Sequence, residues 1–283
     1  TQFTFDISLL DVGLFLLKNT HLYFSQFKGN AFALGAELEE WKIEILNTVP
    51  NNINSFIGAE MHLRCDMTAL KYLFIGGAKF SKATYSGVSQ PWCSNVRVFN
   101  FYGPTEATIY SHVHEIKRDP TLDCDDTNVT VGKPVKRMFH AIQDRTSNSL
   151  LGFNSLGEIL LGGDQLMRGY LNNPTATQRA ITNIDNVNYY RTGDLGFQDE
   201  EGDLFVVGRL DETIKRRGFR VNLLDIDAYI QKIQGINDCI TLAFADENLE
   251  NWLLTVVIAK SPIDKILLFT QMRHFLLEHQ IPD

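Results

Sequence analysis

The sequence lacks the features that mark several classes of protein. No apolar run reaches the roughly 18 residues that a membrane span requires, and no repeat or low-complexity segment is visible. The cysteines are few and far apart, with no Cys-x-x-Cys or Cys/His spacing: Cys65, Cys93, Cys124 and Cys239. A zinc site or a disulfide framework therefore has little support, and a reducing, cytoplasmic compartment fits best.

Basic residues are also fewer than acidic residues. The 26 Lys and Arg residues stand against 34 Asp and Glu residues, which gives a formal net charge of -8. This balance disfavours nucleic acid or an anionic membrane as the main partner and favours a small ligand. With 283 residues, of which 44% are hydrophobic, the chain can bury a sizeable core in one large and one small domain.

Two segments predict buried strands that each lead into a glycine-containing loop. They are "LKYLFIGGAKFS" and "VRVFNFYGPTE", with a helix-length stretch between them. This order predicts α/β layering, in which ligands bind at the loops that leave the carboxyl ends of the strands. From about Val129 to Val207 the pattern changes to short alternating strands separated by "GFNSLG" and "DEEGD", which indicates a small β-rich subdomain.

A third pattern follows the segment "GRLDE". We expect a strand or hairpin in "TIKRRGFRVN", then a helix "LLDIDAYIQKI" capped by Asn222, and strands in "CITLAFA" and "WLLTVVIA". A final helix is expected to begin with Ser261 as its cap and Pro262 in its first turn. This order is that of a small α+β domain, so we divide the chain into a large part, 1–209, and a small domain, 210–283.

The densest group of polar residues follows the second predicted strand, in "FNFYGPTEAT". Asn100, Tyr102, Thr105 and Glu106 supply an amide, a phenol, a hydroxyl and a carboxylate. A nucleotide site requires such a set, because a phenol stacks on a base, an amide bonds its edge, a hydroxyl donates to a phosphate and a carboxylate holds Mg²⁺. The dipeptide Gly103-Pro104 is equally compatible with a simple turn.

Three further segments are weak signals when each is taken alone. In "YYRTGDLG", Asp194 can accept both hydroxyls of a ribose, but Gly193 and Asp194 are also compatible with the tip of a hairpin. "GRLD" is common at strand ends, and "KRRGFR" is more often a solvated basic face than a site.

In this order, the segments resemble the adenylate-forming, AMP-binding enzymes, most closely the amino-acid adenylation domains of nonribosomal peptide synthetases. The matching segments are "FTFDISLLD", "LKYLFIGGA", "FNFYGPTEAT", "LGEILLGGDQLMRGYLNNPTAT", "YRTGDLG" and "GRLDETIKRRGFRVNLLDID". They cover almost the whole chain from Phe3 to Asp227. The resemblance implies ATP-dependent formation of an aminoacyl adenylate, followed by transfer to the phosphopantetheine thiol of a peptidyl carrier protein.

The resemblance also implies roles for single residues. Tyr102 would stack on adenine, Asn100 would contact its amino edge, and Glu106 would hold Mg²⁺. Asp194 and Arg209 would hold the ribose. The catalytic candidates are Thr105 (toward the α-phosphate), Glu106, Arg209 and Asp211 (the hinge between the domains), and the nucleotide site also includes Gly76, Gly77, Phe101 and Gly103.

A second set of residues corresponds to the amino-acid pocket of that family. An Asp in the segment "FDxS" pairs with the α-amino group of the substrate, and here it is Asp6, which is also compatible with a helix cap beside Ser8. The remaining positions map to Ile7, Leu10, Ile53 or Asn54, Phe74, Gly76, Phe101, Ile109 and Tyr110. With its aromatic side chains and no charge beyond Asp6, the pocket resembles that of glycine-activating domains, so we expect it to exclude larger amino acids.

Two elements of the family pattern are absent from the sequence. A Ser/Thr/Gly-rich phosphate loop would precede "FTFDISL", and a catalytic lysine in an Asn-Gly-Lys loop would follow "IPD". We therefore expect a fragment that is poor at the first half-reaction.

One alternative is an acyl- or aryl-CoA ligase of the same superfamily, against which Asp6 argues because those substrates lack an amine. The other is a degenerate, non-catalytic nucleotide-binding module.

Overall fold

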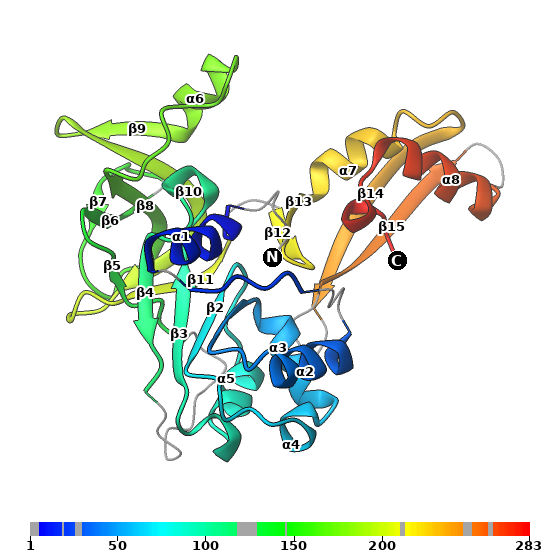
Figure 1. Cartoon of the computed structure of the whole chain (residues 1–283). Coiled ribbons are helices and arrows are strands. Elements are labelled where there is room, and N and C mark those ends of the chain that lie inside the picture. Colours follow the sequence, from blue (N-terminus) through cyan, green and yellow to red (C-terminus); the bar gives the residue numbers. More distant parts are fainter. Residues whose placement is uncertain are drawn as a thin grey trace. The chain divides into compact units, whose positions relative to one another are not determined.

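The chain folds into two compact units, Thr1–Leu210 and Asp211–Asp283. A computed structural model describes residues 6–18, 20–25, 30–117, 129–144, 146–209, 213–245, 251–259 and 263–283, and its elements are labelled in Figure 1. The predicted hinge, Asp211, lies outside the described residues. Its role, and the assignment of the two units as a partial core and a mobile domain, stay predictions.

The first part of the larger unit has the predicted α/β layers. Its helices are α1 (Ser8–Lys18), α2 (Ala31–Glu40), α3 (Pro50–Gly58), α4 (Met61–Arg64) and α5 (Lys82–Val88), and its strands are β1 (Ile45–Thr48), β2 (Tyr72–Gly76), β3 (Arg97–Tyr102), β4 (His112–Glu115) and β5 (Lys133–Pro134). The strand order is β1-β2-β3-β4-β5, with β1, β2 and β3 parallel and the other two antiparallel. The two predicted strands are thus parallel neighbours, and their carboxyl ends meet at one edge of the sheet.

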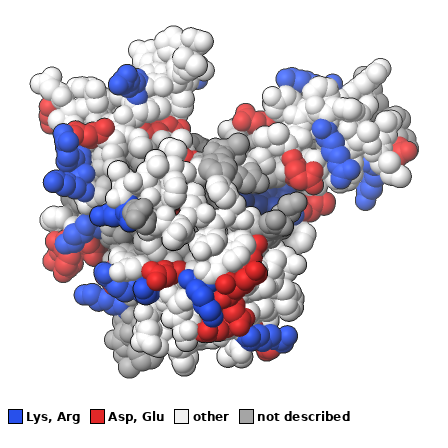
Figure 2. Space-filling view, in the orientation of Figure 1, with Lys and Arg blue, Asp and Glu red and all other residues white. Residues whose placement is uncertain are grey.

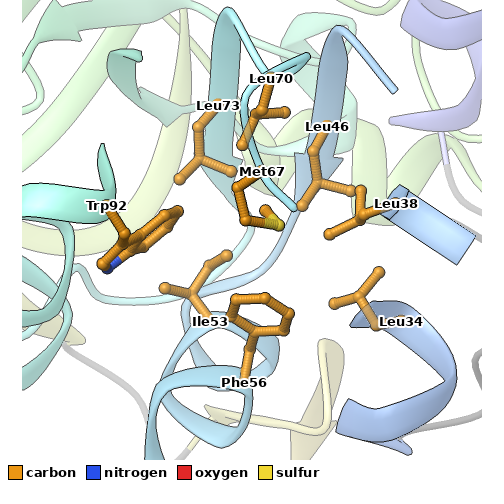
Figure 3. Close-up of a pocket in the computed structure, with 9 residues that line it drawn as sticks. All are labelled: Leu34, Leu38, Leu46, Ile53, Phe56, Met67, Leu70, Leu73 and Trp92. Atoms are coloured by element: carbon orange, nitrogen blue, oxygen red, sulfur yellow. The ribbon is translucent and has the colours of Figure 1, made fainter. Parts of the chain in front are cut away.

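One face of this sheet packs against helices α3 and α5. Leu73, Ile75 and Val98 alternate along β2 and β3 and are fully buried in a cluster with residues of both helices. An apolar pocket in this core, shown in Figure 3, is lined by Leu34, Leu38, Leu46, Ile53, Phe56, Met67, Leu70, Leu73 and Trp92. Its only polar side-chain group, the Trp92 indole N–H, donates to the carbonyl of Gly87 (3.0 Å). The pocket is therefore part of the packed core and is not suited to a polar ligand.

The predicted β-rich subdomain forms a second, antiparallel sheet. It contains β6 (Met138–Gln143), β7 (Leu150–Leu151), β8 (Gly157–Gly163), β9 (Ile181–Ile184), β10 (Val187–Gln198) and β11 (Leu204–Arg209), with the short helix α6 (Pro174–Ala180) before β9. The order is β11-β10-β8-β6-β7, and β9 pairs with β10. A cluster that includes Tyr102 of β3 with Ile142 and Ile159 of this sheet joins the two sheets into one unit.

The smaller unit has the predicted α+β elements. They are a hairpin of β12 (Thr213–Arg216) and β13 (Phe219–Asn222), helix α7 (Leu223–Ile230), a hairpin of β14 (Ile236–Ala245) and β15 (Asn251–Ala259), and helix α8 (Lys265–Phe275). Ile226, Ile230, Leu253 and Met272 lie in its core. The predicted cap of the last helix is wrong: Asp264 caps α8, because its carboxylate accepts from Ile266 N (2.8 Å). Ser261 and Pro262 lie outside the described residues.

Acidic and basic side chains are interspersed on the face of the molecule drawn in Figure 2. None of the helices in the described ranges has the length and apolar character that crossing a membrane requires.

Candidate nucleotide and amino-acid site

Strand β3 presents the predicted pocket residues and the predicted nucleotide residues on opposite faces. Successive side chains of a strand alternate, so Phe101 shares a face with Phe74 of β2, and their ring centroids are 5.3 Å apart. Asn100 and Tyr102 point to the other face, where Tyr102 packs in the cluster that joins the two sheets. Strand β3 therefore has aromatic side chains in contact on one face and the residues of the polar cluster on the other.

The turn after β3 is tight and strained. A Cβ atom on Gly103 would lie 2.6 Å from the carbonyl oxygen of Ile109, so only glycine fits there. Thr105, Glu106 and Ala107 form a short 3₁₀ turn, and the β-branched residues Thr108 and Ile109 follow with positive φ values of 53° and 70°. Such residues avoid this region, and strain of this kind concentrates at functional sites.

Tyr102, Asp194 and Arg209, which the sequence places far apart, form one cluster. The Tyr102 hydroxyl donates to Asp194 Oδ2 (2.5 Å), and Arg209 Nη1 donates to Asp194 Oδ1 (2.6 Å) and to the Thr192 carbonyl (3.2 Å). The side chains of Asp194 and Arg209 are 12% and 17% exposed. A charged pair so far removed from water is held by charge-assisted hydrogen bonds, so its geometry is fixed before any ligand arrives.

A β-bulge presents Asp194 to this cluster. The segment is not the tip of a hairpin, which was the alternative; it lies inside β10, where the register with β8 shifts between Arg191 and Leu195. Gly193 adopts a φ of 67°, and its N–H donates to Glu158 Oε1 (3.2 Å). Thr192 Oγ1 accepts from Asp194 N (2.9 Å). Bulges commonly re-aim a side chain next to a binding site.

Other predicted nucleotide residues also lie at the strand ends. Asn100 is 2% exposed, and its amide nitrogen donates to the carbonyl of Thr130 (3.0 Å). Gly76 ends β2, and Gly77 follows with a φ of 79°. Thr105 is exposed in the 3₁₀ turn. The contacts of these residues with a nucleotide remain predictions.

The aromatic face holds buried polar atoms that have no protein partner. Asp6 Oδ2 and Tyr110 Oη are both buried and make no hydrogen bond. The Tyr110 ring stacks on Phe101 (centroids 4.5 Å apart), and a Cβ atom on Gly76 would lie 2.8 Å from Tyr110 Oη. Burial, followed by the negative charges of Asp11 and Asp6, raises the pKa of Tyr110. An unpartnered buried polar atom is costly, so these two mark a place for a polar ligand group.

Asp11, which the sequence analysis did not assign, adds a second carboxylate near Tyr110. Asn47 Nδ2 donates to Asp11 Oδ1 (3.1 Å), and Asn47 is the register partner of Phe74, on the same face. Burial raises the pKa of Asp11, and the hydrogen bond from Asn47 opposes that rise. The expectation of no charge beyond Asp6 is therefore corrected. The sequence held no signal for this second carboxylate, because Asp6 and Asp11 are five positions apart and not the three or four that place two side chains on one helix face.

The apolar pocket positions are only partly brought together. Ile7 approaches Gly77, where an added Cβ would lie 3.4 Å from Ile7 Cδ1. Leu10 is half-buried on α1. The two alternatives for the remaining position lie elsewhere: Ile53 is in the core behind Leu73, and Asn54 accepts from Thr84 Oγ1 of α5 (3.0 Å). Leu73 alternates with Phe74, so that core is on the opposite face of the sheet.

Glu106 is contacted by Tyr170, a residue of the segment "LGEILLGGDQLMRGYLNNPTAT" to which no role was assigned from the sequence. Tyr170 donates its hydroxyl hydrogen to Glu106 Oε1 (2.7 Å), and Met167 N donates to the Glu106 carbonyl (2.7 Å). The partners are 64 residues apart, so no local pattern reveals the contact.

The carboxylate of Glu106 is suited to Mg²⁺ that binds together with the phosphates of a nucleotide. Among the described residues, no group of three or more His, Cys, Asp and Glu side chains is arranged to hold a metal ion. Mg²⁺ does not need one, because it is usually bound by one or two carboxylates together with substrate phosphates. Glu106, half-buried at the edge of the turn, offers one carboxylate for binding of this kind, and its role as a metal ligand stays a prediction.

The candidate site thus combines two sheets joined by one hydrophobic cluster, a strained turn and a buried Asp194–Arg209 pair. The family model described as AMP-binding enzyme matches residues 1–171, and the chain belongs to this family. Tyrocidine synthase 3 of Brevibacillus parabrevis is 28% identical over 286 residues, which are 99% of this chain and 4% of that protein. The predicted resemblance to synthetase adenylation domains is confirmed.

Solved structures show the same fold. The adenylation domain AlmE of Vibrio cholerae, solved with glycyl-adenosine-5'-phosphate, has a TM-score of 0.88 at 23% identity, over 100% of this chain and 53% of that one. An artificially fused adenylation and carrier (PCP) di-domain from Klebsiella oxytoca, NpsA-ThdA, has a TM-score of 0.82 at 18% identity, over 100% of this chain and 52% of that one. The chain spans 38% of the dapdiamide synthesis protein DdaD of Enterobacter agglomerans, and smaller shares of the other relatives.

Proposed function

We propose that this chain carries the amino-acid pocket and most of the nucleotide site of an adenylation domain, which activates a small amino acid as its adenylate. The observation that carries the proposal is that the two faces of β3 present different sets of candidate binding residues. Phe101 stacks on Tyr110, whose buried hydroxyl has no partner and which lies within reach of the charge of Asp6. On the other face of the strand, Tyr102 donates to Asp194, which pairs with Arg209. An aminoacyl adenylate has two such halves, an ammonium group and a ribose, joined at a phosphate.

Asp194 is equipped to bind ribose without giving up its present partners. A carboxylate offers about four lone-pair sites, and Tyr102 and Arg209 each occupy one of them. Lone pairs therefore remain for two ribose hydroxyls. Asp194 pairs with the positive charge of Arg209, and hydrogen bonds that involve charged groups are stronger than neutral ones.

The turn after β3 supplies groups for the phosphate. Attack of a carboxylate on the α-phosphate brings two anions together, so the site must aim positive charge and hydrogen-bond donors at the phosphoryl oxygens. Mg²⁺, when bound with ATP, supplies much of that charge. Glu106 would hold the metal, and the exposed Thr105 hydroxyl would donate to the α-phosphate.

The aromatic face favours a substrate with a small side chain. Asp6 would accept the α-ammonium group, and Tyr110 Oη would be a second acceptor for the same group. Phe74, Phe101 and Tyr110 fill the rest of the face with rings in contact. The glycyl adenylate in the AlmE structure supports glycine as the substrate class. The fused carrier domain of NpsA-ThdA supports a carrier protein as the acceptor in the second half-reaction.

The test uses bisubstrate analogues, which need no catalysis by the chain. Calorimetry would compare sulfamoyl-adenosines that carry a glycyl, an acetyl or a phenylalanyl group. We expect the glycyl compound to bind best, and the acetyl compound, which lacks only the amine, to bind about 10- to 100-fold more weakly, because Asp6 then stays unpaired. Asp6→Asn should remove that difference, and Asp194→Asn should weaken all three compounds alike.

Each competing function gives a different result in this experiment. Equal binding of the glycyl and acetyl compounds would favour an acyl-CoA ligase over amino-acid activation. Preference for the phenylalanyl compound would exclude a glycine-like substrate. If none of the compounds binds, the proposed nucleotide site is wrong.

A further inference from the structure

Three hydrogen bonds tie the turn that carries Glu106 to the loop between β8 and α6. The Glu106 carbonyl accepts from Met167 N (2.7 Å), and Thr108 Oγ1 donates to the carbonyl of Gln165 (2.7 Å). The third bond reaches the functional group itself, from Tyr170 Oη to Glu106 Oε1 (2.7 Å). The first two bonds fix the backbone of the turn, and the third fixes the direction of the carboxylate.

Tyr170 is itself held in place by α6. Its backbone N–H donates to Thr177 Oγ1 (2.9 Å), and this hydroxyl in turn donates to the carbonyl of Asn173 (3.0 Å). A Cβ atom on the preceding residue, Gly169, would lie 2.8 Å from Thr177 Cγ2, so the loop and the helix touch closely. These contacts fix the position of the tyrosine backbone before its side chain reaches Glu106.

The contact is made by a neutral hydroxyl group. A tyrosine phenol has an ordinary pKa of about 10 and therefore carries its proton near neutral pH. A neutral O–H donor satisfies one carboxylate oxygen and brings no positive charge that would compete with a cation for Glu106.

We propose that Tyr170 is a positioning residue that holds the Glu106 carboxylate in the orientation required by the magnesium ion of Mg·ATP. This inference rests on the proposed function of Glu106 as the metal ligand. A carboxylate that is already oriented loses less side-chain freedom when the metal binds, and hydrogen-bonded partners of metal ligands commonly set metal affinity by 10- to 100-fold. Tyr170 acts through Glu106 and need not touch the nucleotide.

The test separates metal binding from nucleotide binding in the chain as it exists. Mn²⁺ is the probe, and its binding in the presence of a non-hydrolysable ATP analogue is followed by electron paramagnetic resonance. Tyr170→Phe removes only the hydroxyl, and we expect it to weaken Mn²⁺ binding about tenfold. Affinity for the analogue without metal, measured by calorimetry, should be unchanged, because the Tyr102–Asp194–Arg209 cluster is intact.

Tyr189→Phe is the matched control. Tyr189 lies on β10 with its ring against Phe139 (centroids 5.5 Å apart), and the same change there should leave Mn²⁺ binding unaltered. The double variant Tyr170→Phe/Glu106→Gln should bind Mn²⁺ no more weakly than Glu106→Gln alone, because Tyr170 acts only through that carboxylate.

Two results would overturn the inference, and they are distinguishable from each other. In the first, wild type binds the analogue and Tyr170→Phe keeps full Mn²⁺ affinity, or it loses affinity for the metal-free analogue as much as affinity for Mn²⁺. Tyr170 is then a structural residue of the loop, and the proposed function stands. If wild type does not bind the analogue at all, the proposed function and the role of Tyr170 fail together.

Discussion

Tyr102 and Asp194, 92 residues apart in the sequence, are joined by a hydrogen bond of 2.5 Å between Oη and Oδ2. Tyr102 ends a strand of the first sheet, and Asp194 lies in the bulge of a strand of the second. Burial, followed by the charge of Asp194, raises the pKa of Tyr102, so the phenol remains a donor. The bond therefore links the two sheets at the place where we propose that adenine and ribose bind.

Two Tyr→Phe changes should have opposite effects on stability. Tyr102→Phe removes the donor of a buried hydrogen bond to a carboxylate, so the free energy of unfolding should fall by about 1.5–3 kcal/mol. Tyr110→Phe removes a buried hydroxyl that has no partner, so the free energy of unfolding should be unchanged or rise by about 1 kcal/mol. Urea unfolding of the two variants measures both. Equal losses of stability would show that the Tyr110 hydroxyl is bonded in solution.

A buried pair of histidines also joins the two sheets. His112 Nε2 lies 2.8 Å from His140 Nδ1, and His140 Nε2 lies 2.9 Å from Gln198 Oε1. The Gln198 oxygen can only accept, so neutral His140 donates from Nε2 and accepts from His112 at Nδ1. An added proton on His140 would face the His112 N–H. Burial and then His140 lower the pKa of His112 to about 3, and burial also lowers the pKa of His140.

The histidine pair predicts a loss of stability in mild acid. Below a pH of about 6.5 the unfolded chain binds protons that the folded chain excludes, so the free energy of unfolding falls by up to about 1.4 kcal/mol per pH unit for each imidazole. Above that pH the stabilisation is complete. His140→Gln keeps a hydrogen-bonding group near the position of Nε2 and removes one titrating group, so urea unfolding between pH 7 and pH 4 should show a shallower slope. The exposed His274→Gln is the control, and an equal effect there would contradict the prediction.

Arg216 should be the most sensitive charged residue of the smaller unit. Its side chain is 3% exposed, pairs with Asp283 and donates to the carbonyl of Ile281 (2.6 Å), while Asp283 Oδ2 accepts from Leu253 N (2.8 Å). Arg216→Met removes the charged partner of Asp283 and the donor to the Ile281 carbonyl, and we expect a loss of about 3 kcal/mol. Hydrogen exchange in β13 and β15 should rise in this variant and not in Arg217→Met, at the exposed turn. Similar exchange in both variants would contradict the role of the buried pair.

The sequence predicted those parts of the fold that local chemistry determines. Apolar runs that lead into glycine-containing loops predicted β2 and β3. The segment "TIKRRGFRVN", expected to form a strand or a hairpin, forms the hairpin of β12 and β13. The cap of the last helix was misplaced because Ser261 and Asp264 are both good caps, and the choice between them depends on where the helix packs. Family resemblance then identified Tyr102, Asp194 and Arg209, which the structure brings together.

The rest depends on contacts between distant segments. Nothing near Tyr170 in the sequence shows that its hydroxyl meets Glu106, and nothing near Asp11 shows that Asn47 lies across from it. The sequence did not show which of Ile53 and Asn54 belongs to the amino-acid pocket. In the structure both residues of α3 lie on the core side of the sheet, and their positions in the sequence do not reveal this. Side-chain partners of this kind are decided by tertiary packing, which single-sequence patterns do not contain.

Phe101 should set the upper size limit for the substrate, and Phe99 offers a matched control on the same strand and face. Phe101 stacks on Tyr110, whose buried hydroxyl has no partner, whereas Phe99 packs against Phe74 further back along β3. Phe101→Ala should open the pocket, so that leucyl sulfamoyl-adenosine gains affinity relative to the glycyl compound, by about 1–3 kcal/mol for each methylene accommodated. Phe99→Ala should lose stability on the order of 2 kcal/mol, similar to Phe101→Ala, and keep the wild-type preference. Calorimetry with both compounds measures the preference. A shift of equal size in both variants would show that a general loosening of the sheet, and not Phe101, sets the limit.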